Sequence, residues 1–160
     1  MRVAGPTSKP RLRSLLTTLL LLGAVSCGGD DPMDIVATAS DLLGTWNITS
    51  LVHTPVGGGT PVEEVVAGLS GSVVFRQDLT YTIAFQDAGP PVVSESENGT
   101  YMVTGSSLTI TPDNAPLDVT TLEIQSLTSN GVTLYQADDD YDFDDDGTDD
   151  PATTTVRLEK

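Results

Sequence analysis

The chain has 160 residues and carries 23 Asp and Glu against seven Lys and Arg, a formal net charge of −16. This length suits one domain, and a surface of this charge repels nucleic acid and anionic lipid head groups, so we expect neither to bind the folded surface. The single cysteine excludes an intramolecular disulfide, and the fold must therefore depend on its own apolar core.

The N-terminus has the pattern of an export signal. Basic residues come first, an apolar run of 11 residues follows over 15–25, and a run of small residues ends at Cys27. A membrane-spanning helix needs about 20 residues, so this run is too short for a permanent span. The run Ala-Val-Ser-Cys resembles a bacterial lipobox, whose cysteine is lipidated and becomes the new N-terminus.

We therefore expect a lipoprotein signal peptide over residues 1–26 and a lipid on Cys27. The lipid would attach the protein to a membrane of the bacterial cell envelope, outside the cytoplasm. The alternative is a plain secretory signal that leaves Cys27 as a free thiol. After residue 26 the chain keeps three basic side chains, those of Arg76, Arg157 and Lys160.

Residues 27–39 are predicted to be a flexible tether in front of a folded domain over residues 40–160. The tether is rich in Gly, Asp, Ala and Pro and has no sustained hydrophobic period. Ser40 is expected to cap a single helical turn, which Gly44 ends in a left-handed conformation.

The rest of the chain is predicted to be all-β. Thr, Val, Ile and Tyr dominate, as in half-buried strands. Tyr81, Ile83 and Phe85, for example, alternate with smaller side chains, which is typical of a strand with one apolar face. Eight strands are expected, at 45–53, 71–77, 79–86, 99–104, 107–111, 119–127, 131–136 and 153–159.

The lengths of the connections indicate how these strands are arranged. The links after the second, fourth and sixth strands are short, and the last of them contains the tight-turn pair Asn130-Gly131. The links after the first, third, fifth and seventh strands are long. Alternate links of an up-and-down meander lie at opposite ends, so the pattern predicts an eight-stranded antiparallel barrel with one closed end and one loop-rich mouth.

The start of the first strand resembles the lipocalin family. Leu43-Gly44-Thr45-Trp46 matches the Gly-x-Trp motif of that family and follows a short helical turn. The resemblance covers residues 40–160. It implies that Trp46, just after Gly44, plugs the closed end of the barrel and that Arg157 on the last strand packs over its ring. It also implies a small apolar or amphipathic ligand in the barrel, with the first long loop as a lid. The alternative for this loop is a short helix that caps the core.

The candidate ligand-binding residues lie on the predicted inner face of the barrel. An eight-stranded barrel is near the size at which side chains fill the interior or leave room for one small ligand. A packed interior without a cavity therefore stays open as the alternative. The candidates are Phe75, Tyr81, Ile83, Phe85, Tyr101 and Val103.

An acidic run over residues 138–150 is predicted to be a loop between the last two strands. Nine of these residues from Asp142 onward fit D-x-D-x-D-G-x-x-D, similar to the calcium loops of thrombospondin type 3 repeats and to the start of an EF-hand. Thr153 replaces the bidentate Glu of the EF-hand, which predicts a weak dissociation constant of about 10⁻⁴–10⁻³ M. A solvated acidic run is the alternative. The candidate calcium ligands are Asp142, Asp144, Asp146, Thr148 and Asp150.

Two functions are consistent with these patterns. The first is a lipid-anchored extracytoplasmic protein that binds a small apolar or amphipathic ligand. The second is a non-transporting interaction module of the cell envelope, with a packed barrel and an acidic loop that binds calcium. We expect no enzyme and no cofactor other than calcium, because the single histidine, His53, leaves no His-based metal cluster or catalytic set and is expected on the surface.

Overall fold

The structure is a computed structural model and describes residues 35–87 and 93–160. The predicted signal peptide, Cys27 and the first part of the predicted tether lie outside these residues. None of the helices in the two described ranges is long and apolar enough to cross a membrane. The elements in chain order are α1 (Ala39–Leu42), β1 (Gly44–Pro55), β2 (Val62–Glu63), α2 (Glu64–Ala67), β3 (Ser70–Phe75), β4 (Thr80–Gln86), β5 (Ser94–Thr104), β6 (Ser107–Pro112), β7 (Thr120–Leu127), β8 (Gly131–Tyr141) and β9 (Asp150–Glu159).

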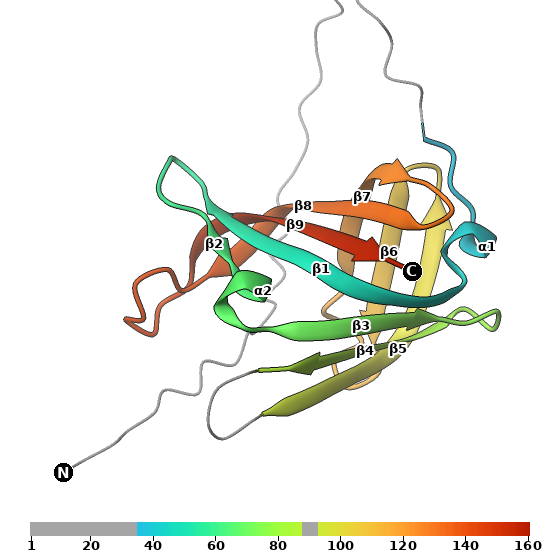
Figure 1. Ribbon diagram of the computed structural model, residues 1–160, viewed down its shortest axis with the longest axis horizontal. Coiled ribbons are helices and arrows are strands. Elements are labelled where there is room, and N and C mark those ends of the chain that lie inside the picture. The colour runs from blue at the N-terminus through green and yellow to red at the C-terminus, as the bar shows by residue number, and fades with distance from the viewer. Residues whose placement is uncertain (1–34, 88–92) are drawn as a thin grey trace, which may run out of the picture.

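The strands form a closed antiparallel barrel (Figure 1). From β3 to β9 each strand pairs with the next in the chain, β1 pairs with β3, and the β1–β9 pairing closes the sheet. The short β2 continues the edge of β1 beyond its contact with β3, through Val52 and His53. The predicted eight-stranded up-and-down barrel is therefore confirmed, with β2 as a two-residue addition.

The two ends of the barrel differ as the connection lengths predicted. The tight links at 76–79, 105–106 and 128–130 lie at one end, beside α1, and we call this the closed end (Figure 1). The links between β1 and β3, β4 and β5, β6 and β7, and β8 and β9 are longer and lie at the other end, which we call the mouth. The described chain therefore enters the barrel at the closed end, directly after α1.

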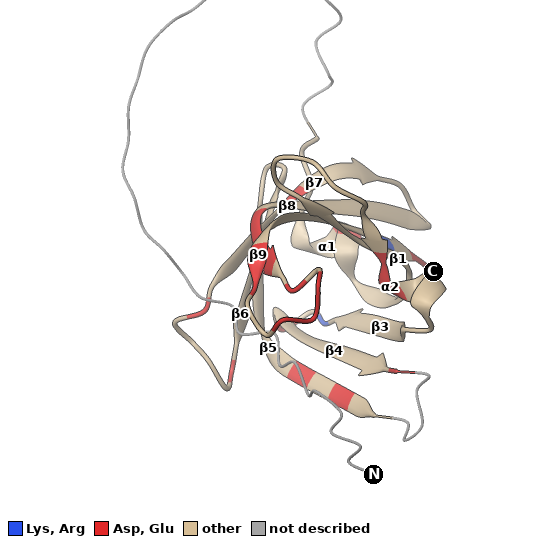
Figure 2. Cartoon of the chain, turned by 90° about the vertical axis from the view of Figure 1, so that its left-hand side faces the viewer, with Lys and Arg blue, Asp and Glu red and all other residues tan. Residues whose placement is uncertain are grey.

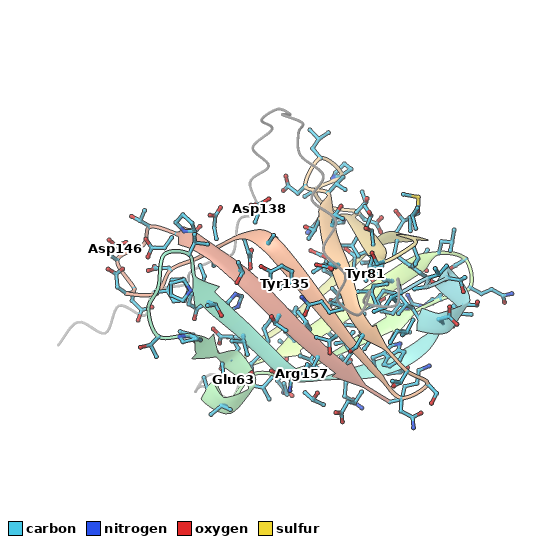
Figure 3. All side chains as sticks on the ribbon, turned by 90° about the horizontal axis from the view of Figure 1, so that it is seen from above. Glu63, Tyr81, Tyr135, Asp138, Asp146 and Arg157 are labelled. Carbon is cyan, nitrogen blue, oxygen red and sulfur yellow. The ribbon has the colours of Figure 1, made fainter. Side chains whose placement is uncertain are left out.

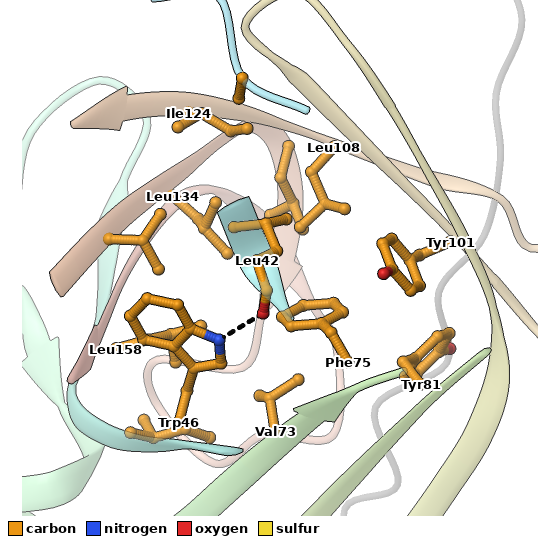
Figure 4. Close-up of a cluster of buried hydrophobic side chains, with 14 residues drawn as sticks. Leu42, Trp46, Val73, Phe75, Tyr81, Tyr101, Leu108, Ile124, Leu134 and Leu158 are labelled. Carbon is orange, nitrogen blue, oxygen red and sulfur yellow. Dashed lines mark hydrogen bonds between the residues drawn. The ribbon is translucent and has the colours of Figure 1, made fainter. Parts of the chain in front are cut away.

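Trp46 fills the closed end. Its side chain is fully buried, and its indole Nε1 donates a hydrogen bond of 2.6 Å to the carbonyl of Leu42, the last residue of α1 (Figure 4). Leu42 is itself fully buried. Burying a Leu side chain contributes about 1.5–3 kcal/mol, so α1 stabilises the barrel although the helix is a single turn.

The described residues in front of α1, 35–38, are not part of a tether. The backbone N–H of Ala37 donates to the carbonyl of Gly105 at 3.0 Å, and the side chain of Ala37 is buried at the closed end. The helix cap is Thr38 rather than Ser40. Its backbone N–H and its hydroxyl both donate to the Asp41 carboxylate, and these hydrogen bonds hold the pKa of Asp41 below its usual value. The folded domain therefore begins by residue 35, earlier than the predicted residue 40.

The prediction that Arg157 covers Trp46 is wrong. The cation over the indole is Lys160, whose Nζ lies 4.2 Å from the ring centroid. Arg157 is exposed because alternation along β9 turns it outward while Leu158 points into the core. Lys160 follows the end of the strand, where the alternation no longer applies, and its side chain reaches the ring beside Gly44.

The predicted acidic loop over residues 138–150 is shorter in the structure. β8 continues to Tyr141 and β9 starts at Asp150, so the loop covers only residues 142–149. Asp139 pairs with Ala152 and Asp140 with Pro151, after a register shift that follows Gln136. The strand extension has polar side chains and therefore lacks the apolar alternation from which the other strands were predicted.

Gly99 is a position where the packing of the barrel requires glycine. A Cβ at this position would lie 2.2 Å from the carbonyl oxygen of Thr111 and 2.7 Å from Cε1 of Tyr81. Overpacking of this kind costs about 1–3 kcal/mol. We therefore expect Gly99→Ala to lower the free energy of unfolding by about this amount, and with it the urea midpoint of unfolding. Gly131→Ala is the matched control, because its Cβ would meet no atom closer than 3.5 Å. Equal midpoints for the two variants would contradict the prediction.

Candidate functional site

Half of the predicted ligand-binding residues are packed into the barrel interior toward the closed end. These residues are Phe75, Tyr81 and Tyr101, and we call them the packed floor. Phe75, Tyr81 and Tyr101 are 4%, 1% and 3% exposed, too little for direct contact with a ligand (Figure 4). The rings of Phe75 and Tyr101 pack edge to face with centroids 4.9 Å apart, and the Tyr101 hydroxyl donates to the carbonyl of Arg76 at 2.9 Å. These side chains therefore belong to the closed half of the core.

Ile83 and Phe85 lie nearer the mouth and are only half-buried. Phe85 approaches Ile48 across Gly71, where a Cβ would lie within 3.0 Å of both side chains. Val103 is also half-buried, but it pairs with Leu108 beside the β5–β6 turn at the closed end. Ile83 and Phe85 are thus the two predicted residues that stand where a ligand could enter.

Carboxylates share the inner face of the mouth with these apolar side chains. Glu95 pairs with Phe85 and Glu97 with Ile83, so both glutamates stand on the inward face of β5. The Tyr81 hydroxyl donates to Glu97 Oε1 at 2.6 Å, and burial together with this hydrogen bond and the Glu97 charge raises the pKa of Tyr81. Neither glutamate was predicted as a site residue, because neither belongs to a motif with a recognisable chemistry.

A second polar group occupies the opposite wall of the mouth. It consists of His53 on β1, Asp139 and Tyr141 on β8, and Thr154 on β9, and we call it the mouth cluster. His53 Nδ1 lies 2.8 Å from Thr154 Oγ1 and 3.5 Å from Asp139 Oδ2. The ring of His53 stacks on Tyr141 with centroids 4.3 Å apart. The prediction that His53 is a surface residue is wrong, since only 13% of its side chain is exposed.

The hydrogen bonds of the mouth cluster define where its protons lie. Thr154 donates its one hydroxyl proton to the Asp139 carboxylate, so its oxygen accepts the proton on His53 Nδ1. A neutral His53 in this arrangement carries its free acceptor on Nε2. Burial raises the pKa of Asp139, but the hydrogen bonds from His53 and Thr154 outweigh it and the net shift is downward. Asp139 is therefore held as a carboxylate.

The predicted lid segment contains β2 and α2, and hydrogen bonds hold it at the rim of the mouth. The Tyr141 hydroxyl donates to Glu64 Oε1 at the start of α2, and Val65 packs against the core. Glu63 accepts hydrogen bonds from the Ser50 hydroxyl and the Leu51 backbone N–H at 2.7 and 2.8 Å. These contacts fix α2 on the rim beside β1 and β3 (Figure 1).

Three of the predicted calcium ligands lie together in the β8–β9 link, and Asp146 lies at its tip, beyond the body of the barrel (Figure 3). Carboxylate oxygens of Asp142, Asp144 and Asp146 lie within 4.8 Å of one another. Gly147 has a φ of 86°, and its backbone N–H donates to Asp142 at 2.8 Å, while that of Thr148 donates to Asp146 at 2.7 Å. Asp150 is separate from this group and starts β9. Oxygen ligands in this arrangement suit a hard cation.

A hollow of about 490 Å³ lies across the mouth ends of β3, β4 and β5. Along the three strands its serine and alanine residues alternate with Gly71, Phe85 and Glu95, which face into the barrel. The serine and alanine side chains therefore face outward, and the hollow opens mainly on the outer face of the sheet. Its lining residues are Ser70, Gly71, Ser72, Ala84, Phe85, Gln86, Ser94, Glu95 and Ser96.

Two solved structures are similar to this chain in fold. One is a lipocalin-like protein from Bacteroides uniformis ATCC 8492, with 14% identity, a TM-score of 0.42, and coverage of 70% of this chain and 96% of the other. The other is an uncharacterized protein from Bacteroides eggerthii DSM 20697, with 12% identity, a TM-score of 0.45, and coverage of 74% and 99%. No curated protein matches the chain.

The family comparison agrees with the motif at Trp46 and with the barrel. The lipocalin-like domain family matches residues 42–134, which is more than half of the chain and includes the strands from β1 into β8. The chain belongs to the lipocalin-like domain family.

Proposed function

We propose that the protein is a lipid-anchored, extracytoplasmic binding protein for a small apolar or amphipathic ligand, and not an enzyme. The observation that supports this best is the pair of half-buried side chains Ile83 and Phe85, which face the polar mouth cluster across the barrel. An apolar surface with a few convergent polar groups is typical of small-molecule sites.

The packed floor limits where the ligand can bind. Because Phe75, Tyr81 and Tyr101 fill the closed half, the ligand would occupy the mouth half and would reach no deeper than the rings of this floor. Its apolar part would contact Ile83 and Phe85, and its polar part would lie toward the mouth cluster.

The anchor would hold the barrel by its closed end. The described chain enters β1 through α1 at the closed end, and Cys27 lies only a few residues before the first described residue. An extended chain spans about 3.3–3.6 Å per residue, so a lipid on Cys27 would keep the closed end toward the membrane. The mouth would then face away from it.

The alternative function is a non-transporting interaction module whose acidic loop binds calcium. The packing of Phe75, Tyr81 and Tyr101 favours it, because a filled floor leaves less room for a carried molecule. The grouped carboxylates of Asp142, Asp144 and Asp146 favour the calcium site. The two functions differ in whether a molecule occupies the mouth half of the barrel.

Native mass spectrometry of protein purified from its own envelope distinguishes these functions. We expect an additional mass that is lost on denaturation. Ile83→Trp should remove that mass by filling the mouth half, whereas Met102→Trp, at a position that is 58% exposed, should retain it. Circular dichroism would establish that both variants fold. A wild-type protein without additional mass would favour the interaction module.

Replacement of Cys27 tests the anchor. Without the thiol no acyl chain can be attached, and two acyl chains are needed for stable anchoring. We therefore expect Cys27→Ser to move the protein from the membrane fraction to the soluble fraction, as measured by fractionation of cells and immunoblotting. A variant that stays in the membrane fraction would show that the lipobox interpretation is wrong.

Calcium should stabilise the protein at millimolar concentration, given the expected dissociation constant of about 10⁻⁴–10⁻³ M. The measurement is the midpoint of thermal unfolding with and without Ca²⁺. Asp144→Asn should abolish the increase, and Asp113→Asn, an exposed position on the β6–β7 link, should leave it intact. An unchanged midpoint in the wild type would exclude the calcium site.

A further inference from the structure

The wall of the barrel lacks strand pairing along part of β1. On one side, β1 pairs with β9 over most of its length. On the other side, it pairs with β3 only over Gly44–Asn47 and with β2 only at Val52 and His53. Residues 48–51 therefore have no paired strand on this side within the described chain. We call the interval between them and residues 70–71 of β3 the seam.

Apolar side chains close the seam on the inner face of the barrel. Ile48 and Phe85 meet over Gly71, where a Cβ would lie 2.8 Å from Cδ1 of Ile48 and 3.0 Å from Cδ1 of Phe85. Val65 of α2 packs against the same core. Phe85 and Ile83 are the proposed apolar contacts of the ligand. The seam therefore leads to the proposed ligand position, and it can open without breaking a β1–β3 ladder.

The lid segment, residues 62–69, lies in the seam, with α2 between β1 and β3 (Figure 1 and Figure 2). One oxygen of Glu63 accepts from the Leu51 backbone N–H at 2.8 Å, and the other accepts from the Ser50 hydroxyl at 2.7 Å. This carboxylate replaces a strand partner at residue 51 and also accepts from the Val65 N–H at the start of α2. Apart from the two residue pairs of β2, side-chain hydrogen bonds thus hold the segment in place.

Glycines with a positive φ stand near both ends of the lid segment. Gly58 in the β1–β2 link has a φ of 102°, and Gly68 after α2 has a φ of 115°. Glycine adopts such conformations at no steric cost, and hinges lie in loops and at the ends of elements. Val66 on α2 is 86% exposed, so the helix packs on one side only. The segment can therefore move about these two positions while β3 to β9 keep their pairing.

We propose that the lid segment is a gate in the barrel wall, which moves away from the seam and opens a side entrance to Ile83 and Phe85. The ligand enters between β1 and β3. Glu63 and the hydrogen bond from Tyr141 to Glu64 hold the gate closed before and after entry. The inference rests on the proposed binding function and adds the route of entry.

Thiol labelling measures the opening of the gate. In the Cys27→Ser protein, Val65→Cys places the only thiol on the packed side of α2, where iodoacetamide reacts slowly until the segment lifts. Glu63→Ala should raise the labelling rate at least about tenfold, because the Leu51 and Val65 N–H groups lose a charged acceptor. Glu123→Ala, on the exposed face of β7, is the control with the same loss of charge and should leave the rate unchanged.

A second thiol and a second variant separate the gate from a general loosening of the barrel. Val103→Cys, half-buried on β5 at the closed end, should not label faster in Glu63→Ala. Tyr141→Phe removes the hydroxyl that donates to α2 and should speed labelling of Val65→Cys, whereas Tyr135→Phe on the same strand should not. An equal increase at Val103→Cys, or no increase in either Glu63→Ala or Tyr141→Phe, would contradict the gate.

Association kinetics test whether a ligand uses this entrance. The probe is N-phenyl-1-naphthylamine, a neutral apolar fluorophore, and stopped-flow fluorescence gives both rate constants. A gate changes the barrier and not the bound state, so Glu63→Ala should raise association and dissociation about tenfold each and leave Kd unchanged, and Glu123→Ala should change neither. Faster labelling with unchanged rate constants would refute the side entrance and leave the binding function intact. A wild-type protein that does not bind the probe would contradict the binding function itself.

Discussion

The pairing of the first strand with the last is the constraint on which the rest of the structure depends. β1 pairs with β9 from Asn47 opposite Glu159 to Pro55 opposite Ala152, and this pairing closes the sheet into a barrel. The same pairing brings His53 beside Thr154, and the β8–β9 pairing adds Asp139. These three residues are far apart in the chain, so the mouth cluster exists only because the barrel closes.

Closure also divides the interior into two halves with different chemistry. In the closed half, α1, Trp46 and the rings of Phe75 and Tyr101 exclude water, and each fully buried apolar side chain contributes about 1.5–3 kcal/mol. In the mouth half, the apolar side chains are only partly buried and polar groups share the inner face. A narrow barrel can thus be stabilised by one half and bind a ligand in the other.

The sequence predicted the barrel well because its signals are local. Alternation of side chains, connection lengths and the Gly-x-Trp motif at Trp46 each require only neighbouring residues. The site was predicted less well because it depends on register. The shifts after Ile48 and after Gln136 decide which face His53 and Asp139 occupy, and a shift of one residue reverses the face of a strand. The polar ends of β5 and β8 had no apolar alternation, and Lys160 rather than Arg157 covers Trp46 because it lies just beyond β9.

The excess of negative charge at the mouth gives the acidic loop a physical reason to bind a cation. Like charges that the fold brings together destabilise it unless a cation neutralises them, and Lys160 and Arg76 lie at the other end of the barrel. Calcium on the oxygens of Asp142, Asp144 and Asp146 would relieve this repulsion in the loop, at the end of the barrel opposite the basic side chains of the closed end.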